Sequence, residues 1–255
     1  MKKVTICVLA YGEYPDLAKR CIDSIIDNCP RELYELRVGC NKVCLDTLAY
    51  MTGLVHKGLI DCLYISHENL NKCRMMRRMY KDISTEWIWW FDDDSYVTRP
   101  DAMDNWLARA AADSASPKPP VLYGKVFFFG KPSDFDYGLD IRAWISKQSW
   151  YRGHPIPCGV TCREDGFNMD AANPDNRFFF VTGGVHMIKT DFVNMIGWPT
   201  STLVKRNDDV ILCCAVRQNE YSFADLDYGV EINKHDRRGE GEDKQTMEKQ
   251  LGGAQ

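Results

Sequence analysis

The sequence predicts an α/β fold, with a mostly parallel, doubly wound sheet and helices on both of its faces. Short β-rich apolar runs alternate with segments of helical periodicity through the first hundred residues. The opening run, residues 4–10, is uninterrupted, which is typical of a strand buried on both faces in a parallel sheet. The composition, 45% hydrophobic and 27% charged over 255 residues, is that of a globular protein with a substantial core.

The N-terminal elements follow one another as strand and helix. The helix expected over residues 14–28 carries Leu17, Cys21 and Ile25 on one face and ends before Pro30. Further helices are expected over residues 44–56 and 71–83, the second of them basic, and further strands over residues 33–38, 60–66 and 87–91. Because parallel neighbours need a crossover connection, this order gives a β-α-β-α-β-α-β unit.

The second half mixes strands and helices around one long irregular segment. Residues 130–176 are rich in Gly, Pro and Asp, and long segments of this kind are usually functional or mobile. The elements expected around this segment are helices over residues 101–112, 191–196 and 208–218 and strands over residues 121–129, 177–181 and 221–231. The charged, Gly-rich tail after Arg237 is expected to be loose. These elements predict a smaller, mixed C-terminal part of the fold.

Composition and charge narrow the classes of function. The net charge of −4 and the pI of about 5.8 give no global attraction to nucleic acid, although a local basic groove would suffice. The N-terminal apolar run is broken at Gly12 and no stretch has the length of a membrane span, so we expect no transmembrane segment and a cytoplasmic location. The eleven cysteines are interpreted as small buried hydrophobic residues, because neither Cys40-x3-Cys44 nor Cys158-x3-Cys162 has the spacing of a zinc knuckle.

Three consecutive aspartates, Asp92, Asp93 and Asp94, follow the apolar strand at residues 87–91. Ligands of open α/β sheets bind at the carboxyl ends of strands, and three adjacent negative charges need a counter-charge. Mg²⁺ or Mn²⁺ would supply it, because hard cations prefer carboxylate oxygens. An isolated Asp-Asp-Asp is better interpreted as an acidic turn, or as Asp94 capping a helix. The position after a strand with three tryptophans favours the metal site.

Three further signals are weak when taken singly. Gly183 and Gly184 follow a strand, where they let the backbone approach a ligand or simply make a tight turn. Asp208 and Asp209 begin a helix, where an acid can cap the helix or serve as a general base. His235 is a candidate metal ligand at a strand end or an ordinary surface residue.

The order of these motifs resembles that of the GT-A glycosyltransferases. The opening VTICVLAYGEYPDLAKRCIDSI is similar to the start of the family-two-like group, and WFDDDSYV with the later TGG and DDV is similar to fringe-like enzymes. The resemblance extends to about Gly239. It implies a GT-A (Rossmann-like) fold in a single catalytic domain over residues 1–255, with a nucleotide-binding half at 1–100, an acceptor-binding half at 101–239 and a loose tail at 240–255.

The same resemblance implies a reaction. A metal-dependent glycosyltransferase would move a sugar from a nucleoside-diphosphate sugar to an acceptor hydroxyl, with inversion. Mn²⁺ or Mg²⁺ is the implied cofactor, and the implied acceptor is a saccharide or a hydroxymethylated DNA base. The basic helix around Arg74 and the cluster of Lys234, Arg237 and Arg238 would help with DNA, although solvated surfaces have the same composition.

Residue roles follow from the resemblance position by position. Asp94 and His235 would bind the metal, with Asp92 shared between the cation and the donor. Asp209 would be the general base, with Asp208 as the alternative. The remaining residues implied for the donor site are Ala10, Tyr11, Lys72, Arg74, Asp93, Gly183 and Gly184, of which the two glycines would border the sugar and the acceptor.

One position departs from the pattern. These enzymes often place an acidic residue after the second strand, to bind the base or the ribose. The corresponding segment here is Arg37-Val-Gly-Cys-Asn-Lys, in which Asn41 would hydrogen-bond a base without bringing a charge. The resemblance therefore leaves the identity of the nucleotide open.

Two other functions fit part of the pattern. A nucleotidyltransferase also combines a doubly wound sheet with an acidic metal site, but its N-terminal loop is usually Gly-rich and basic, whereas residues 10–14 contain one glycine and no Arg or Lys. A non-catalytic nucleotide-sugar-binding module would have no need of a general base. The chain retains the Asp-Asp-Asp triplet, the aspartate pair and His235 together, which favours the enzyme.

Overall fold

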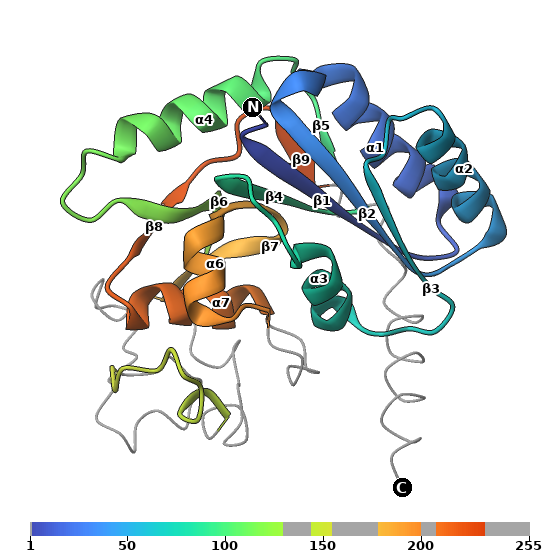
Figure 1. Ribbon diagram of the computed structural model, residues 1–255. Helices are drawn as coiled ribbons and strands as arrows, with labels where there is room; N and C mark the ends of the chain where they lie inside the picture. Colours follow the sequence, from blue (N-terminus) through green and yellow to red (C-terminus); the bar gives the residue numbers. More distant parts are fainter. Residues whose placement is uncertain (1, 130–143, 155–177, 200–207, 233–255) are drawn as a thin grey trace, which may run out of the picture.

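The computed structural model describes residues 2–129, 144–154, 178–199 and 208–232. Its centre is a seven-stranded sheet in the order β3-β2-β1-β4-β7-β6-β8, accompanied by a two-stranded sheet of β5 and β9 (Figure 1). The strands are β1 Val4–Gly12, β2 Tyr34–Val43, β3 Cys62–Ser66, β4 Trp87–Asp92, β5 Ser95–Val97, β6 Pro120–Phe129, β7 Phe178–Lys189, β8 Ser222–Asp225 and β9 Val230–Ile232. The helices are α1 Pro15–Asn28, α2 Leu45–His56, α3 Lys72–Tyr80, α4 Ala102–Asp113, α6 Thr190–Ile196 and α7 Asp208–Gln218, with a short 3₁₀ turn at Arg31–Leu33.

The N-terminal half of the large sheet is parallel, as the strand-helix alternation predicted. Strand β1 pairs in parallel with β2 on one side and with β4 on the other, and β2 pairs in parallel with β3. The carboxyl ends of these strands therefore lie along one edge of the sheet, where open α/β sheets bind ligands. The C-terminal half is mixed, because β7 is antiparallel to both β4 and β6 whereas β6 and β8 are parallel.

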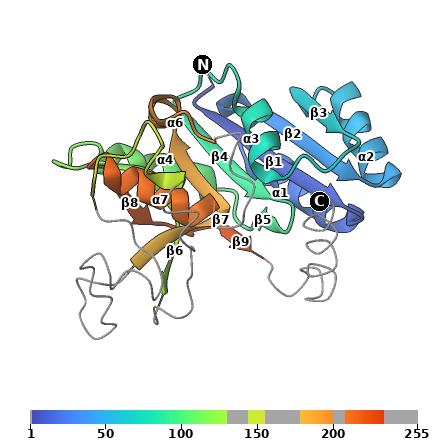
Figure 2. The ribbon, with the colours of Figure 1, turned by 90° about the horizontal axis from the view of Figure 1, so that it is seen from below.

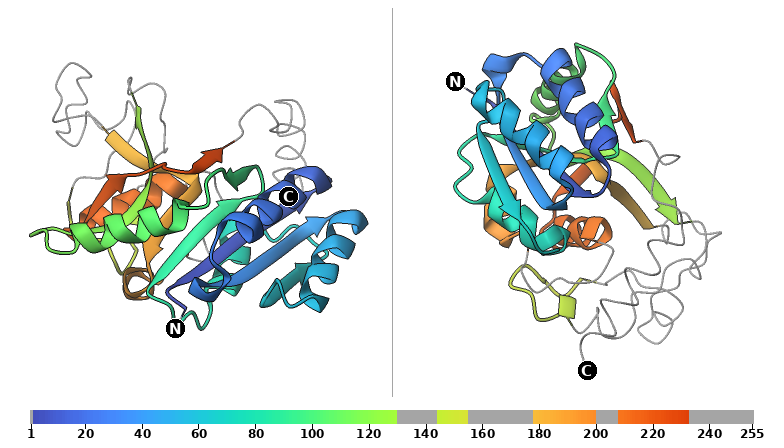
Figure 3. Two further views of the ribbon diagram at one scale, coloured as in Figure 1. Left: turned by 90° about the horizontal axis from the view of Figure 1, so that it is seen from above. Right: turned by 90° about the vertical axis from the view of Figure 1, so that its right-hand side faces the viewer.

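Helices cover both faces of the sheet, which confirms the predicted fold class. Helices α1, α2 and α4 lie on one face, and α3, α6 and α7 lie on the other (Figures 1 and 3). Side chains of β4 alternate between the two cores, with Trp89 and Phe91 on the α1 side and Ile88 and Trp90 on the α3 side. Because both faces are buried, the strand is apolar from Trp87 to Phe91, and this explains its tryptophan-rich sequence.

The cysteines are buried hydrophobic residues, as expected. All nine that the described ranges contain are free thiols, and seven of them are buried. Burial raises the pKa of the Cys29 and Cys40 thiols to about 12, so both stay protonated near neutral pH. Cys158 and Cys162 lie outside the described residues. No helix in the described part of the chain is long and apolar enough to cross a membrane.

Several boundaries differ from the sequence prediction. Strand β7 does not end before the two glycines but runs on through Gly183 and Gly184 to Lys189. The region expected as one strand at 221–231 is divided between two sheets, because the chain turns at Gly229, whose φ of +70° is disfavoured for other residues. Helix α3 begins one residue later than expected, where the side chain of Asn71 accepts a hydrogen bond from the backbone N–H of Arg74.

We expect two glycine substitutions to change the free energy of unfolding in opposite directions. A Cβ atom at Gly124 in β6 would lie 2.6 Å from a methyl of Val181 and 2.9 Å from the carbonyl oxygen of Val185. Overpacking should therefore make Gly124→Ala less stable by about 1–3 kcal/mol. At Gly53 in α2 a Cβ would meet nothing within 4 Å, so Gly53→Ala should be more stable by about 0.5–1 kcal/mol. Urea unfolding monitored by circular dichroism measures both, and equal effects of the two substitutions would contradict this packing.

Candidate active site

The three aspartates lie where the sequence placed them, at the carboxyl edge of the parallel strands. Asp92 ends β4, and Asp93 and Asp94 form the turn into β5. A carboxylate oxygen of Asp93 accepts a hydrogen bond from the backbone N–H of Tyr11 at 2.9 Å. Because Tyr11 is near the end of β1, this bond fixes the turn to the neighbouring strand. Asp93 and Asp94 are each only 6% exposed, so the triplet is not a solvated acidic turn.

Both carboxylate oxygens of Asp92 are hydrogen-bonded. Oδ1 accepts the indole N–H of Trp90 at 3.0 Å, and Oδ2 accepts the ammonium of Lys72 at 3.0 Å. Burial raises the pKa of Asp92, and the charge of Lys72 opposes that increase. Asp92 is therefore held in one orientation by β4 itself and by the first residue of α3.

Lys72 is the centre of the site. Its ammonium also lies 3.3 Å from Oδ2 of Asp208 and donates to the carbonyl oxygen of Gly183 at 2.9 Å. The ring centre of Trp90 is 5.6 Å away, within the range of a cation–π contact. Burial alone would lower the pKa of this ammonium, but the carboxylates of Asp208 and Asp92 raise it overall. Lys72 stays charged and joins α3, β4, β7 and α7 at one point.

The aspartate pair at the start of α7 faces the same point. Oδ1 of Asp209 accepts the N–H of Val210 at 2.8 Å, and Oδ2 accepts the N–H of Gly183 at 3.4 Å. Burial and then the charge of Asp208 raise the pKa of Asp209 to about 6, against the opposing charge of Lys72. A carboxylate with a pKa near the working pH is suited to act as a general base.

The two glycines of β7 pass between these groups. A Cβ at Gly183 would lie 3.2 Å from Nζ of Lys72 and 3.3 Å from Cβ of Asp209, and one at Gly184 would lie 3.3 Å from Ile232. On the same side as Ile232, the hydroxyl of Ser95 donates to Oδ1 of Asp94 at 3.3 Å and to the carbonyl of Gly184 at 3.4 Å. The backbone of β7 thus approaches the acids on one side and the aspartate turn on the other.

A buried histidine adjoins the cluster. His186 of β7 stacks on the indole of Trp90, with ring centres 6.4 Å apart. Burial and the charge of Lys72 lower the pKa of His186 to about 3, so the imidazole is neutral at physiological pH. Its Nε2 has no hydrogen-bond partner among the described residues. His186 therefore adds no positive charge, and Lys72 provides the compensation for Asp92 and Asp208.

The residues expected to line the nucleotide pocket form a hydrogen-bonded network. Asn41, only 2% exposed, accepts the N–H of Leu70 at 2.9 Å and donates to the side chain of Asn69 at 3.2 Å. Asn69 in turn donates to the hydroxyl of Tyr11 at 3.0 Å. The side chain of Asn41 is thus directed at its neighbours in the protein, and Tyr11 and Asn69 are the outer members of the network. Asn69 has no motif signal in the sequence.

Three residues expected in the donor site, Lys72, Arg74 and Ala10, differ from one another in their surroundings. Lys72 is directed at the acids rather than outward, with 24% of its side chain exposed. The side chain of Arg74 is exposed on the first turn of α3. Its backbone N–H donates a hydrogen bond to the side chain of Asn71. Ala10 is buried at the end of β1. The long-range contact of Lys72 with α7 is not visible in the local sequence pattern.

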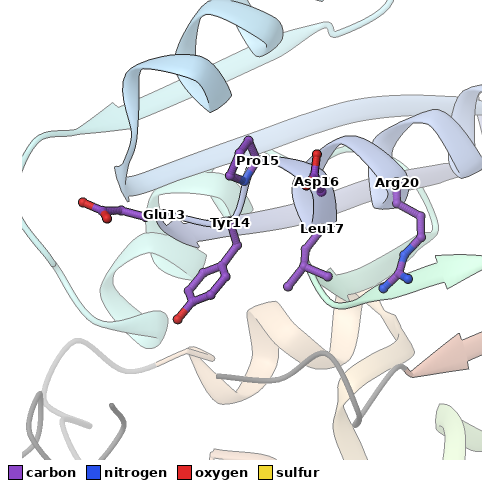
Figure 4. A pocket seen from close by; sticks show the side chains of 6 residues that line it. All are labelled: Glu13, Tyr14, Pro15, Asp16, Leu17 and Arg20. Carbon is purple, nitrogen blue, oxygen red and sulfur yellow. The ribbon is translucent and has the colours of Figure 1, made fainter. Parts of the chain in front are cut away.

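A cavity of about 440 Å³ lies at the start of α1. Figure 4 shows Tyr14, Leu17 and Arg20 projecting from the same side of the helix into it. The guanidinium of Arg20 lies over the ring of Tyr96 at 4.5 Å, and Tyr96 is two residues after Asp94. Arg20 has no distinctive signal in the sequence, because it lies beside Lys19 in a helix of mixed charge.

Of the two main metal ligands expected, the described residues include Asp94 but not His235. They contain no group of three or more His, Cys, Asp or Glu side chains arranged to hold a metal ion. His235, the expected C-terminal ligand, lies outside the described residues. The carboxylate of Asp94 is the type of oxygen ligand that Mg²⁺ and Mn²⁺ prefer.

No protein-family model matches the chain, and no curated protein matches it. Solved structures do. A mannosyltransferase from Pyrobaculum calidifontis, solved with GDP-Man and Mn²⁺, superposes with a TM-score of 0.55 at 16% identity over 88% of this chain and 54% of that one. S. aureus TarS superposes with a TM-score of 0.55 with UDP bound and 0.51 with UDP-GlcNAc bound, each at 12% identity. These superpositions cover 89% and 91% of this chain, and 61% and 60% of the solved TarS piece, residues 1–349. The chain thus spans 54–61% of these solved chains and shares their GT-A fold.

The raised pKa of Asp209 predicts how stability changes with pH. Relative to its ordinary value of 3.8, a folded-state pKa of about 6 means that the contribution of this carboxyl to stability is full below about pH 4 and is lost as the pH rises through 6. The neutral amide of Asp209→Asn avoids this loss. We expect the variant to exceed the wild type by about 1–3 kcal/mol at pH 8 and to match it near pH 4.

Urea denaturation at both pH values measures this difference. Asp191→Asn, at an exposed carboxyl in the first turn of α6, is the matched control and should show no such dependence. An Asp209→Asn variant that was no more stable than the wild type at pH 8 would show that the carboxyl is well solvated.

Proposed function

We propose that this chain is a metal-dependent glycosyltransferase that moves a sugar from a nucleoside-diphosphate sugar to an acceptor hydroxyl. The observation that carries the proposal is the half-buried cluster of Asp92, Lys72, Asp208 and Asp209 beside the aspartate turn, at the ligand-binding edge of a GT-A fold. A binding module would have no use for a desolvated carboxylate with a pKa of about 6. A role as general base in catalysis would explain why the chain contains such a desolvated carboxylate.

The donor site is proposed at the carboxyl ends of β1, β2 and β4. Ala10, Tyr11 and Asn69 would border the nucleoside, with Asn41 holding Asn69 in place. Arg20 would contact the diphosphate from the cavity at the start of α1, because a guanidinium matches phosphate geometry. The GDP-Man and UDP-GlcNAc bound to the structural neighbours support a nucleotide-sugar donor.

The proposed cofactor is Mn²⁺ or Mg²⁺, with Asp94 as the principal carboxylate ligand and His235 as a second ligand. Asp92 is proposed to face the donor rather than the cation, because Trp90 and Lys72 already engage its two oxygens. When bound, the cation would neutralise charge on the leaving nucleoside diphosphate. The Mn²⁺ in the neighbouring mannosyltransferase structure supports this choice of ion.

Asp209 is the proposed general base, with Asp208 as the supporting acid. As the acceptor oxygen forms a bond to the anomeric carbon, its proton passes to Asp209, and the electron pair of the breaking C–O bond leaves with the nucleoside diphosphate. Lys72 binds Asp208, so Asp209 is the member of the pair that can receive the proton. The resemblance to family-two-like and fringe-like enzymes supports inversion in this single displacement.

The chain is proposed to act as one catalytic unit. Residues 1–100 would bind the donor and residues 101–239 would bind the acceptor, whereas residues 240–255 lie outside the described residues. The Lys72 contact with Asp208 joins the two proposed halves directly.

Incubation with a panel of nucleotide sugars and Mn²⁺, with measurement of the nucleoside diphosphate released, tests the function. Asp209→Asn should lose transfer by about 10²–10⁴-fold, the usual contribution of a general base, while calorimetry shows unchanged donor affinity. If donor affinity fell with transfer, Asp209 would be a binding residue instead of the base.

The metal assignment has a separate readout. Asp94→Asn should weaken Mn²⁺ binding, measured by electron paramagnetic resonance in the presence of GDP or UDP, and should lose metal-dependent release of the nucleotide. Asp101→Asn removes an exposed carboxylate at the start of α4 and serves as the control. Unchanged Mn²⁺ affinity in the Asp94 variant would exclude Asp94 as a ligand.

A further inference from the structure

Residues of β6, β7 and β9 line a second cavity, of about 200 Å³. The three strands lie next to one another in Figure 2. Its apolar wall consists of Phe127 of β6, Val185 of β7, and Val230 and Ile232 of β9, and the polar side chain of Thr182 completes it. None of these residues belongs to the acid cluster around Lys72.

The cavity exists because β7 bulges. Residues 182–185 of β7 stand opposite the single residue Lys125 of β6, since the pairs on either side are Val126–Val181 and Gly124–His186. An insertion of this size interrupts the ladder and redirects the side chains of the bulged strand. Thr182 and Val185, the first and last residues of the bulge, line the cavity.

The same bulge connects the cavity to the proposed reaction centre. Thr182 is followed by Gly183, whose backbone N–H donates to Asp209 at 3.4 Å. On the other side, Ile232 would be 3.3 Å from a Cβ at Gly184, and the carbonyl of Gly184 accepts the hydroxyl of Ser95 beside Asp94. A ligand in the cavity would therefore lie next to the backbone that touches the proposed base and the aspartate turn.

The size and surface of the cavity suit one sugar ring. Its volume is below the range of about 300–1,000 Å³ typical of sites for drug-sized ligands. Phe127, together with the aliphatic side chains, offers an apolar surface on which the C–H face of a ring can pack. Thr182 supplies a hydroxyl for a polar contact, and its oxygen already accepts the N–H of Gly184 at 3.3 Å.

The charges at the rim favour an uncharged ligand. Among the described lining residues, the charged side chains are those of Lys125, Asp227 and Glu231. Lys125 is paired with Asp227 at 2.5 Å, which leaves the carboxylate of Glu231 as the net charge. An anionic ligand would approach that carboxylate with its charge uncompensated.

We infer that this cavity is the acceptor subsite and that it binds an uncharged sugar ring, an inference that rests on the proposed function. A neutral saccharide is thereby favoured over a hydroxymethylated base in DNA, because the phosphates of DNA would be repelled at the rim.

Binding of the acceptor alone tests the inference without any donor. Saturation-transfer NMR would compare methyl glucoside, methyl mannoside and methyl N-acetylglucosaminide with methyl glucuronide. The wild type should saturate at least one neutral glycoside and not the glucuronide. Phe127→Ala should reduce that binding about tenfold, since it removes the aromatic surface. Glu231→Lys should allow the glucuronide to bind. Glu32→Lys, at an exposed acid in the 3₁₀ turn before β2, should leave the preference unchanged.

The two exposed-acid variants keep the test valid even if Phe127→Ala fails to fold. Preference of the wild type for the glucuronide, or the same preference in Glu231→Lys as in Glu32→Lys, would overturn the inference. If the rate of transfer to acceptors were the same in Phe127→Ala and Glu231→Lys as in the wild type, the inference would be overturned too, but the proposed function would stand. Glycoside binding with the expected preference but no release of nucleotide from any donor would instead overturn the proposed function.

Discussion

The contact on which the site depends is that of the Lys72 ammonium with two carboxylates, 3.0 Å from Asp92 and 3.3 Å from Asp208. These acids come from β4 and α7, more than a hundred residues apart, and each carboxylate gains a compensating positive charge from the same ammonium. One ammonium therefore fixes the position of α7 relative to the sheet and the orientation of both acids. Asp209 hydrogen-bonds the N–H groups of Gly183 and Val210, and burial together with the charge of Asp208 raises its pKa to about 6.

The glycine pair makes this contact geometrically possible. Lys72 reaches the carbonyl of Gly183, and Asp209 reaches its N–H, only because no side chain stands between α3, α7 and the strand. On the opposite side, Gly184 lets Ile232 and Ser95 close against the same backbone. The bulge of β7, with its two glycines, thus places the acid cluster, the aspartate turn and the proposed acceptor cavity within a few residues of one another.

The sequence predicts the parallel half of the fold well, because each strand and helix there has its own local periodicity. It places Asp92 at the sheet edge for the same reason. It does not predict that β7 continues through the glycines or that β8 and β9 separate, since both depend on partners distant in the chain. Tertiary contacts also determine three other features: the inward direction of Lys72, the network of Asn41 with Asn69, and the position of Arg20. The assignments of Asp94 and His235 to the metal stay predictions.

The pH dependence of acceptor-dependent nucleotide release tests the central claim most directly. In the wild type the rate should rise as the pH passes about 6, because Asp209 must lose its proton before it can accept one from the acceptor. In Lys72→Met the same rise should occur at higher pH, because the ammonium that favours the charged carboxylate is gone. A midpoint that is the same in both proteins, or a rate that does not change with pH, would contradict the account.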